Sequence, residues 1–232
     1  MDIELLLRVY SMYKIETHMH VSETSGCALL SAEEMIKRYA EAGYDTILVT
    51  DHYVKNYFLK LGDIPWLDKA NKYLSGYRAA LKAGEKYGVT VLLGMELSFV
   101  HCRNDYLVYG ITEDFIKNNP ELYESSYEKF YPIAKENGFL VIQAHSLRDR
   151  VCNPTIEFVD GLEIYNSNPR HEDYNEEVKT LADEHNLLFT AGSDAHRADD
   201  AALSGLFSET PVRNIEEFIA LIKSKKAGII RR

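Results

Sequence analysis

Short apolar runs alternate with amphipathic segments along most of the chain. Runs such as TILV at 46–49 and FLVI at 139–142 are apolar at successive positions, as in strands that are covered on both faces. Amphipathic helices are predicted between the runs, including one long helix from Pro65 to near Gly88. We expect strands at residues 13–20, 46–49, 89–93, 97–100, 106–109, 139–142, 161–165, 187–190 and 228–230.

The order of these elements indicates the fold class. Strands that alternate with helices imply βαβ units and a mostly parallel sheet. Local signals mark the helix ends: Ser31 and Glu34 have the spacing of a capping box, and Gly43 follows as a stop. The chain has no Pro/Gly/Ser-rich linker, low-complexity stretch or charge block. We therefore expect one domain over residues 1–232.

Polar side chains of a common kind follow strand after strand. Imidazole and carboxylate groups stand at or just after the C-terminal ends of the predicted strands: His18, His20, Asp51, His52, Glu96, His145, Asp194 and His196. Barrels gather their catalytic residues on that face, because the loops there converge on one pocket. The pattern therefore predicts a closed or nearly closed α/β barrel with a site at one mouth.

These residue types suit a divalent cation such as zinc, manganese or iron. His18 and His20 lie two residues apart on a strand, so both imidazoles point to the same face and can share one cation. An HxH pair alone is more simply explained as two polar residues at a strand end. The recurrence of imidazoles and carboxylates in equivalent places favours a metal-dependent hydrolase.

Composition narrows the partners and the compartment. With 36 acidic and 26 basic residues the net charge is −10, which argues against binding to long nucleic acid or to a membrane surface. The three cysteines lack CxxC spacing, which favours a reducing compartment. No apolar run has the length of a membrane span, and residues 1–14 are too acidic for a secretory signal. We expect a cytoplasmic protein, and the oligomeric state stays open.

Several motifs carry a resemblance to a known family. KIETHMHVSETSG begins a segment that ends at TDH, and GMELS, QAHS, GLEIYNSN and AGSDAH follow in that order. Together, from about Tyr13 to His196, they resemble the polymerase and histidinol phosphatase (PHP) family. The resemblance implies a distorted (βα) barrel, which we expect to have seven strands. It also implies two or three divalent ions (Zn, Mn or Fe) and hydrolysis of phosphate esters.

The resemblance implies a ligand set as well. Four side chains would share one ion: His18, His20, Glu96 and Asp194. Glu96 would bridge to a second ion held by His145, while His52 and His196 would hold a third. Glu96 and Asp194 would then position a metal-bridging hydroxide, the nucleophile of an in-line displacement at phosphorus.

Two positions depart from the commoner pattern of that family. Many members have an Asp or His soon after HxH, where Glu23 is the one good ligand of this chain. A solvent-facing loop acid is the simpler explanation for Glu23. Members often carry a His before the strand that follows the GxE motif, and Asp105 is our candidate replacement there. If neither residue substitutes, the site holds fewer than three ions.

Candidate substrate contacts follow two of the histidines. Arg148 and Arg197 come soon after His145 and His196, and a guanidinium fork suits a phosphate group. The alternative is a surface arginine that pairs with a neighbouring aspartate. Asn166 follows a strand and could contact substrate, orient a ligand or cap a turn. The remaining histidines are expected to be non-ligands: His101, His171 and His185. Cys27, in the loop after HxH, could contact a metal, but a small loop hydrophobe is the simpler explanation.

The sequence thus predicts a metal-dependent phosphoesterase that hydrolyses a small phosphomonoester, in the manner of a histidinol phosphatase. The alternatives are a nuclease or nucleotide phosphodiesterase, and a non-catalytic structural module of the same fold. The seven side chains that match the family motifs speak against a decayed module.

Overall fold

The strands form one curved sheet. The computed structural model describes residues 12–231. The expectation that the chain has no secretory signal concerns residues 1–14, most of which lie outside the described residues. Within it, a ten-stranded sheet contains β1 (Tyr13–Met19), β2 (Thr46–Val49), β3 (His52–Tyr53), β4 (Thr90–Ser98), β5 (Asp105–Tyr109), β6 (Leu140–Gln143), β7 (Gly161–Asn166), β8 (Leu188–Gly192), β9 (Ser204–Ser208) and β10 (Gly228–Arg231).

The sheet mixes parallel and antiparallel pairs. Its order is β10-β9-β1-β2-β4-β5-β6-β7-β8, and β3 pairs with β4 off this path. The pairs β1–β2, β2–β4, β6–β7 and β7–β8 are parallel, whereas β5 runs antiparallel to β4 and β6. The expected barrel of α/β class is confirmed, but the expected number of seven strands is wrong. Along the described path there are nine, because β9 and β10 add antiparallel strands beyond β1.

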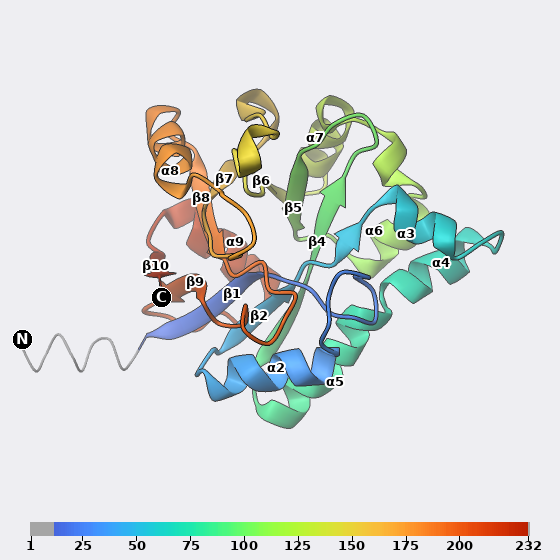
Figure 1. The fold of residues 1–232 in the computed structure, drawn as a ribbon, viewed down its shortest axis with the longest axis horizontal. Helices are drawn as coiled ribbons and strands as arrows, with labels where there is room; N and C mark the ends of the chain where they lie inside the picture. Colours follow the sequence, from blue (N-terminus) through green and yellow to red (C-terminus); the bar gives the residue numbers. More distant parts are fainter. Residues whose placement is uncertain (1–11, 232) are drawn as a thin grey trace, which may run out of the picture.

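The curved sheet nearly closes where β8, at one end of it, returns to β1 (Figure 1). Met19 and Ala195 form a parallel bridge, and the backbone N–H of His20 donates to the carbonyl of Ala195 at 3.1 Å. The hydroxyl of Thr17 donates to the carbonyl of Ala191 at 2.9 Å. These contacts nearly close the barrel and bring the segments after β1 and β8 side by side.

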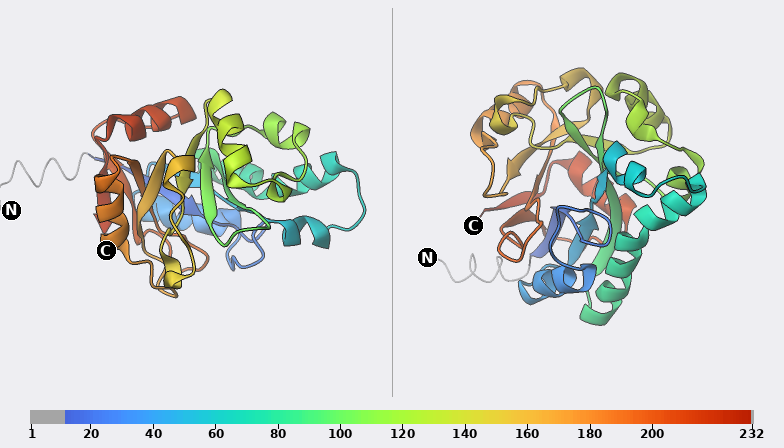
Figure 2. Two further views of the ribbon diagram at one scale, coloured as in Figure 1. Left: turned by 90° about the horizontal axis from the view of Figure 1, so that it is seen from above. Right: turned by 45° about the vertical axis from the view of Figure 1, so that its right-hand side comes forward.

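Helices cover the outside of the sheet (Figures 1 and 2). Helix α2 packs on α5, and α5, α8 and α7 contact β4, β7 and β6 respectively. The helices within the described residues are α2 (Ala32–Glu41), α3 (Lys55–Lys60), α4 (Trp66–Tyr73), α5 (Ser75–Tyr87), α6 (Glu113–Asn118), α7 (Tyr127–Glu136), α8 (Asn175–Glu184) and α9 (Ile215–Ser224), with short 3-10 turns at Leu122–Glu124, Arg148–Arg150 and Ile156–Phe158.

Local signals placed one helix start correctly and missed one helix break. Ser31 and Glu34 form the predicted capping box at the start of α2. The single long helix expected from Pro65 is instead divided into α4 and α5. Thr24 lies at the break: its hydroxyl donates to the carbonyl of Tyr73 at 2.9 Å and accepts from the N–H of Gly76 at 3.1 Å. A distant side chain thus satisfies backbone groups that a continuous helix would have paired internally.

The barrel interior is apolar at the end opposite the site. Leu48, Ile142 and Ala191 pack in one cluster with Phe218 and Ile222 of α9. Figure 2 shows α9 on the opposite side of the sheet from the loops that follow β1 and β7. One end of the barrel is therefore filled mainly by apolar side chains, and the clustered imidazoles and carboxylates lie at the other mouth.

The described strands run from Tyr13 to Arg231 in one sheet. The extent of a single domain over residues 1–232 stays a prediction. Within residues 12–231, no helix combines the length and apolarity needed to cross a membrane.

Candidate metal centre

The polar strand ends converge at the open mouth of the barrel. His18 lies in β1 and His20 directly follows it, and Glu96 lies in β4 opposite His52 of β3. Asp105 begins β5, and the remaining members follow β6 and β8. Eight of the nine predicted ligands come together there: His18, His20, His52, Glu96, Asp105, His145, Asp194 and His196. Their assigned roles as ligands stay predictions.

Glu96 is the centre of the group. Its Oε1 lies 3.3 Å from Nε2 of His18 and 3.1 Å from Nε2 of His145. Its Oε2 lies 3.4 Å from Nε2 of His20 and 2.6 Å from Nδ1 of His52. One carboxylate on β4 therefore contacts four imidazoles from three other segments, the arrangement that a bridging ligand requires.

Asp194 completes a second set around the same histidines. Its Oδ1 lies 3.5 Å from Nε2 of His18 and 3.4 Å from Nε2 of His20. Bonds of about 2.0–2.1 Å around a tetrahedral zinc ion separate neighbouring ligand atoms by about 3.3–3.4 Å. The spacings among these side chains therefore match the edges of a coordination sphere.

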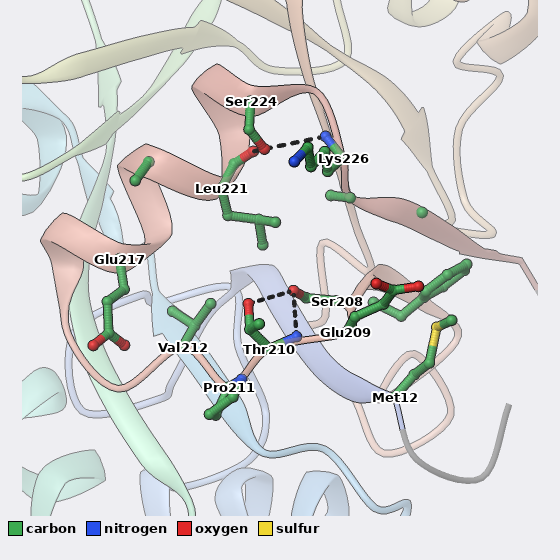
Figure 3. Close-up of a pocket in the computed structure, with 14 residues that line it drawn as sticks. Met12, Ser208, Glu209, Thr210, Pro211, Val212, Glu217, Leu221, Ser224 and Lys226 are labelled. Carbon is green, nitrogen blue, oxygen red and sulfur yellow. Dashed lines mark hydrogen bonds between the residues drawn. The ribbon is translucent and has the colours of Figure 1, made fainter. Parts of the chain in front are cut away.

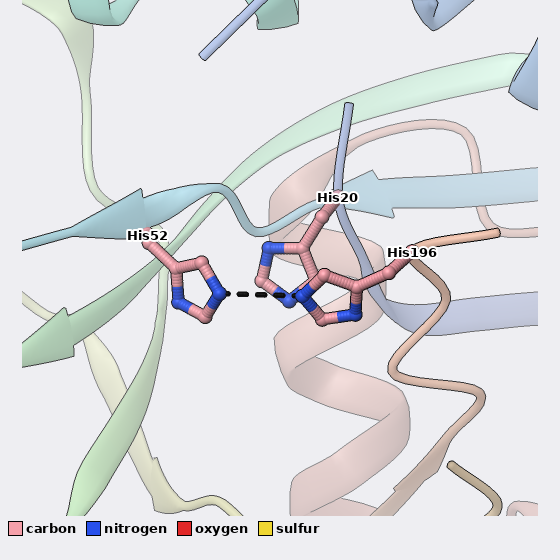
Figure 4. A group of neighbouring side chains, drawn as sticks. All are labelled: His20, His52 and His196. Atoms are coloured by element: carbon pink, nitrogen blue, oxygen red, sulfur yellow. Dashed lines mark hydrogen bonds between the residues drawn. The ribbon is translucent and has the colours of Figure 1, made fainter. Parts of the chain in front are cut away.

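A group of three histidines lies beside this set (Figure 4). Nε2 of His52 and Nε2 of His196 are 3.3 Å apart, and the ring of His20 stacks within 4.2 Å, centroid to centroid, of each of the other two rings. The ligand atoms of His20, His52 and His196 all lie within 4.8 Å of one another. This spacing allows a shared cation.

Asp105 joins the opposite side of Glu96. Its Oδ2 lies 3.7 Å from Nε2 of His145, and its other oxygen accepts a short hydrogen bond from the hydroxyl of Ser98. Glu96, Asp105 and His145 form one of the three groups whose spacing allows a cation. Asp105 therefore lies beside Glu96 and His145, and its role as a ligand of a second ion stays a prediction.

Unpaired buried atoms indicate that these groups fit a cation. Nε2 of His18, Nε2 of His20 and Oε2 of Glu96 are buried and make no hydrogen bond in the described structure. A buried polar atom without a partner costs about 1–3 kcal/mol, and more when it is charged. Divalent cations bound by these nitrogens and oxygens would satisfy them, so the donor set fits zinc, iron or manganese.

Further buried side chains orient the imidazoles. Nδ1 of His18 lies 2.9 Å from Oε1 of Glu163, a fully buried carboxylate in β7. Nδ1 of His20 lies 3.3 Å from the hydroxyl of Ser25, which donates to Asp51 at 2.7 Å. Such partners fix which ring nitrogen faces a metal ion. The residue-level analysis missed Glu163, although an acid within the apolar run GLEIY was a usable signal.

The surroundings shift the pKa values of Glu96 and His20 in ways that favour the anionic carboxylate and the neutral imidazole. Burial opposes ionisation of Glu96, but the neighbouring His52 and His18 hold its pKa well below its usual range. Burial together with His52 and His196 holds the pKa of His20 well below its ordinary value. Glu96 is thus an anion and His20 a neutral imidazole, the forms in which both residues bind metals.

Two members of the group adopt an uncommon backbone conformation. His145 has φ of 30° and Asp194 has φ of 49°, in the left-handed region that residues with a Cβ seldom occupy. Such conformations persist where surrounding contacts enforce them and are concentrated at functional sites. Here they turn the two side chains towards Glu96 and His18 immediately after β6 and β8.

A cavity of about 290 Å³ opens over this group. Both predicted phosphate contacts, Arg148 and Arg197, line it. Arg148 donates from Nη2 to Asp194 at 2.6 Å and from Nε to Asp173 at 2.7 Å, whereas Arg197 is exposed. The sequence analysis did not single out two other lining residues, Asn168 and Arg170.

Three residues lie elsewhere or act differently from what was expected. The carboxylate of Glu23 accepts hydrogen bonds from the backbone N–H of Ala32 and is absent from the three described groups. Asn166 does not line the cavity, and its Nδ2 donates to Glu163 at 2.9 Å and to Asp194 at 3.3 Å. Cys27 does line it: burial opposes ionisation of the thiol, but contacts with His196 and His52 lower its pKa to about 6.

A larger cavity, of about 700 Å³, lies away from this group between α9 and the β9–β10 edge (Figure 3). Its walls include Phe207, Val212 and Leu221, with Glu217 and Lys226 at its border. Among the described residues, none of those in the three candidate metal-binding groups lines this cavity. The candidate metal centre therefore opens to the smaller cavity and not to the larger one.

Comparisons with known proteins agree with this geometry. A two-domain protein of Bacteroides vulgatus that contains a predicted PHP-like metal-dependent phosphoesterase superposes with a TM-score of 0.70 at 14% identity, over 95% of this chain and 65% of that one. PsfC of Pseudomonas syringae gives 0.66 at 16% identity, over 95% and 92%. These likenesses show that the fold is shared.

A relative in sequence is the DNA polymerase III PolC-type of Caldanaerobacter subterraneus subsp. tengcongensis, 31% identical over 83 residues. The matched segment is 36% of this chain and 5% of the polymerase. The family model of the PHP domain matches residues 16–228, which include all the side chains of the group described above. The chain therefore belongs to the PHP domain family.

Proposed function

We propose that the protein is a metal-dependent phosphoesterase that hydrolyses a small phosphomonoester. The observation that carries this proposal is the convergence of buried, mutually spaced imidazoles and carboxylates under a cavity that is lined by arginines. The proposed ions are two or three, of zinc, manganese or iron. The family match and the PHP-like phosphoesterase domain in the Bacteroides vulgatus protein support the reaction class.

The proposed ligand sets follow the three groups. One ion takes His18, His20, Glu96 and Asp194. A second takes Glu96, Asp105 and His145, and a third involves His52 and His196. Bound there, divalent ions would lower the pKa of water and neutralise charge on the phosphate oxygens.

The side chains of this chain have separate tasks in the proposed reaction. Glu163 holds Nδ1 of His18, which leaves Nε2 free to bind. Asn166 and Asn168 each donate to Oδ2 of Asp194 at 3.3 Å and keep that carboxylate in place. Asn166 is therefore proposed as a positioning residue rather than a substrate contact.

Phosphate recognition is assigned to the arginines. Asp173 and Asp194 hold the guanidinium of Arg148 at the cavity wall, so little side-chain entropy is lost when it contacts a phosphate oxygen. Arg197 is free to approach from the exposed rim. A cavity of about 290 Å³ suits a small phosphorylated metabolite better than a polymer.

Metal analysis combined with an aryl phosphate assay tests the proposal. The purified protein should contain bound divalent metal and hydrolyse p-nitrophenyl phosphate, and chelation followed by Zn, Mn or Fe should remove and restore turnover. A panel of small phosphorylated metabolites then identifies the substrate. Fully loaded protein that cleaves neither the aryl phosphate nor any compound in the panel would contradict the proposed activity.

The similarity to a PolC-type polymerase favours one second candidate, cleavage of a nucleotide phosphodiester. The net charge of −10 disfavours a long nucleic acid as substrate. Bis(p-nitrophenyl) phosphate offers the direct comparison, since a diesterase cleaves it faster than the monoester. A third candidate is a non-catalytic module, which would hydrolyse neither p-nitrophenyl phosphate nor bis(p-nitrophenyl) phosphate.

We propose the cytoplasm as the location, because Cys27, Cys102 and Cys152 are all free thiols in the structure.

A further inference from the structure

Cys27 occupies an unexpected place at the mouth of the barrel. It belongs to the loop between β1 and α2, and its side chain is exposed to solvent. Cys27, His52 and His196 nevertheless line the same cavity. Burial opposes ionisation of the thiol, but the two neighbouring imidazoles lower its pKa. The sequence analysis treated this residue as a small loop hydrophobe, an explanation that its polar neighbours do not support.

The loop is anchored on both sides of the cysteine. Two residues before it, the hydroxyl of Ser25 accepts from the N–H of His52 at 3.1 Å. Two residues after it, the N–H of Leu29 donates to the carbonyl of His196 at 2.8 Å. These two bonds hold the loop that carries Cys27 beside His52 and His196.

An ion held by His52 and His196 would have one protein ligand fewer than a catalytic zinc ion usually has, if His20 binds the neighbouring ion. The fully buried Nε2 of His20 has no hydrogen-bond partner, and His20 belongs both to this pair's group and to the group of His18 and Glu96. Nδ1 of His20 faces Ser25, so His20 has one lone pair for one ion. If that ion is the one at His18 and Glu96, His52 and His196 provide only two ligands, whereas catalytic zinc sites usually have three from the protein.

We propose that the Cys27 thiolate is the third protein ligand of an ion held by His52 and His196. The thiol loses its proton to solvent as the sulfur–metal bond forms, and no oxidation is involved. The inference rests on the proposed metal binding and deepens it. A thiolate favours zinc or ferrous iron over manganese or magnesium, so this position should be the most zinc-selective of the set.

X-ray absorption of the zinc-loaded full-length protein is the direct test. One sulfur neighbour at about 2.3 Å from zinc is expected, beside nitrogen and oxygen neighbours at about 2.0–2.2 Å. Cys27→Ser should remove the sulfur signal and lower the zinc content by about one ion per chain. Cys27→His should restore the zinc content without the sulfur signal, because imidazole is an equivalent ligand.

Cys102→Ser is the matched control, since that thiol contacts the carbonyl of Asn104 and not the histidines. It should keep both the sulfur signal and the zinc content. A manganese challenge adds a second readout: the wild-type protein should retain about one zinc ion per chain, and Cys27→Ser should retain none.

The outcomes separate the two proposals. Zinc bound to the wild-type protein without a sulfur neighbour, or equal zinc content in Cys27→Ser and Cys102→Ser, would overturn the role of Cys27 and leave the phosphoesterase proposal intact. A protein that binds no divalent metal would overturn both.

Discussion

At the level of single residues, the chemistry of the site depends on which atom of each side chain remains free. Glu163 and Ser25 face Nδ1 of His18 and His20, which leaves both Nε2 atoms without a partner next to Glu96. Residue type alone identified these histidines as candidate ligands. Which nitrogen stays free became evident only from contacts in the folded chain, since Glu163 is 145 residues from His18 and Ser25 reaches His20 through a loop.

The first prediction concerns His145. Because its Nε2 contacts Glu96 and lies near Asp105, His145→Ala should reduce turnover by more than about 100-fold, beyond the 10–100-fold typical of residues behind a ligand. Steady-state kinetics at saturating metal measure the loss, and circular dichroism checks that the fold is kept. His101→Ala, at an exposed position, should behave as wild type. Near-normal activity of the His145 variant would remove it from the ligand set.

The second prediction distinguishes a ligand from a turn residue at Asp105. Its carboxylate is placed to bind the ion at Glu96 and His145, so Asp105→Ala should lower the affinity for one ion by about 10-fold or more. Equilibrium dialysis with metal analysis measures the change. Asp63→Ala, at an exposed loop position, is the control. Unchanged metal binding in both variants would reduce Asp105 to a structural acid.

At the level of elements, the site depends on how closely strands approach one another. β8 lies against β1 near His18, and Gly192 is the residue of β8 at this contact. A Cβ built on Gly192 would collide with Cβ of His18 and come within 2.9 Å of Oε1 of Glu163. The lack of a side chain at this position therefore allows the contact between His18 and Glu163.

The third prediction follows from this contact. Gly192→Ala should destabilise the protein by about 1–3 kcal/mol, as overpacking does in a close-packed interior. It should also weaken metal binding, because the displaced His18 loses its alignment. Urea unfolding measures the first effect and metal titration the second. Gly26→Ala is the control, because a Cβ there has no neighbour within 4 Å, and it should change neither stability nor metal binding. If Gly192→Ala also left both quantities unchanged, β8 could shift without cost and the prediction would be wrong.

At the level of the whole molecule, the group of ligands connects segments that are far apart in the sequence. The segments after β1, β6 and β8 meet β3 and β4 at one mouth, and α9 packs against the apolar interior at the other end. Glu96 and Asp194 bring buried negative charge into this mouth. A bound cation would compensate that charge and join the segment after β8 to β1 and β4, where the sheet nearly closes.

The fourth prediction concerns metal removal. A ligand that binds only the folded state stabilises it by about 2.7 kcal/mol at a concentration 100 times its dissociation constant. Chelation should therefore lower the midpoint of thermal unfolding, and added zinc should restore it. His145→Ala should show a smaller shift than wild type. Identical midpoints with and without chelator, at metal contents verified by analysis, would contradict a cation that bridges the barrel edges.

The sequence by itself determined the residue types and the local elements. Buried strands appear as continuous apolar runs, and Ser31 with Glu34 determines a helix start through contacts within four residues. The predicted ligands at the strand ends could be named for the same reason, since a polar group after an apolar strand is a local pattern. All but Glu23 lie at the mouth of the barrel.

Only the tertiary structure decided the features that depend on distant pairs. Thr24 divides a helix that the periodicity predicts to be continuous, and Glu163 aligns a histidine that lies 145 residues away. The carboxylate of Glu23 pairs with the backbone of α2, while Cys27 lines one cavity with His52 and His196. Hydrogen bonds and steric contacts act over a few ångströms, so which residues they join depends on how the folded chain brings distant segments together.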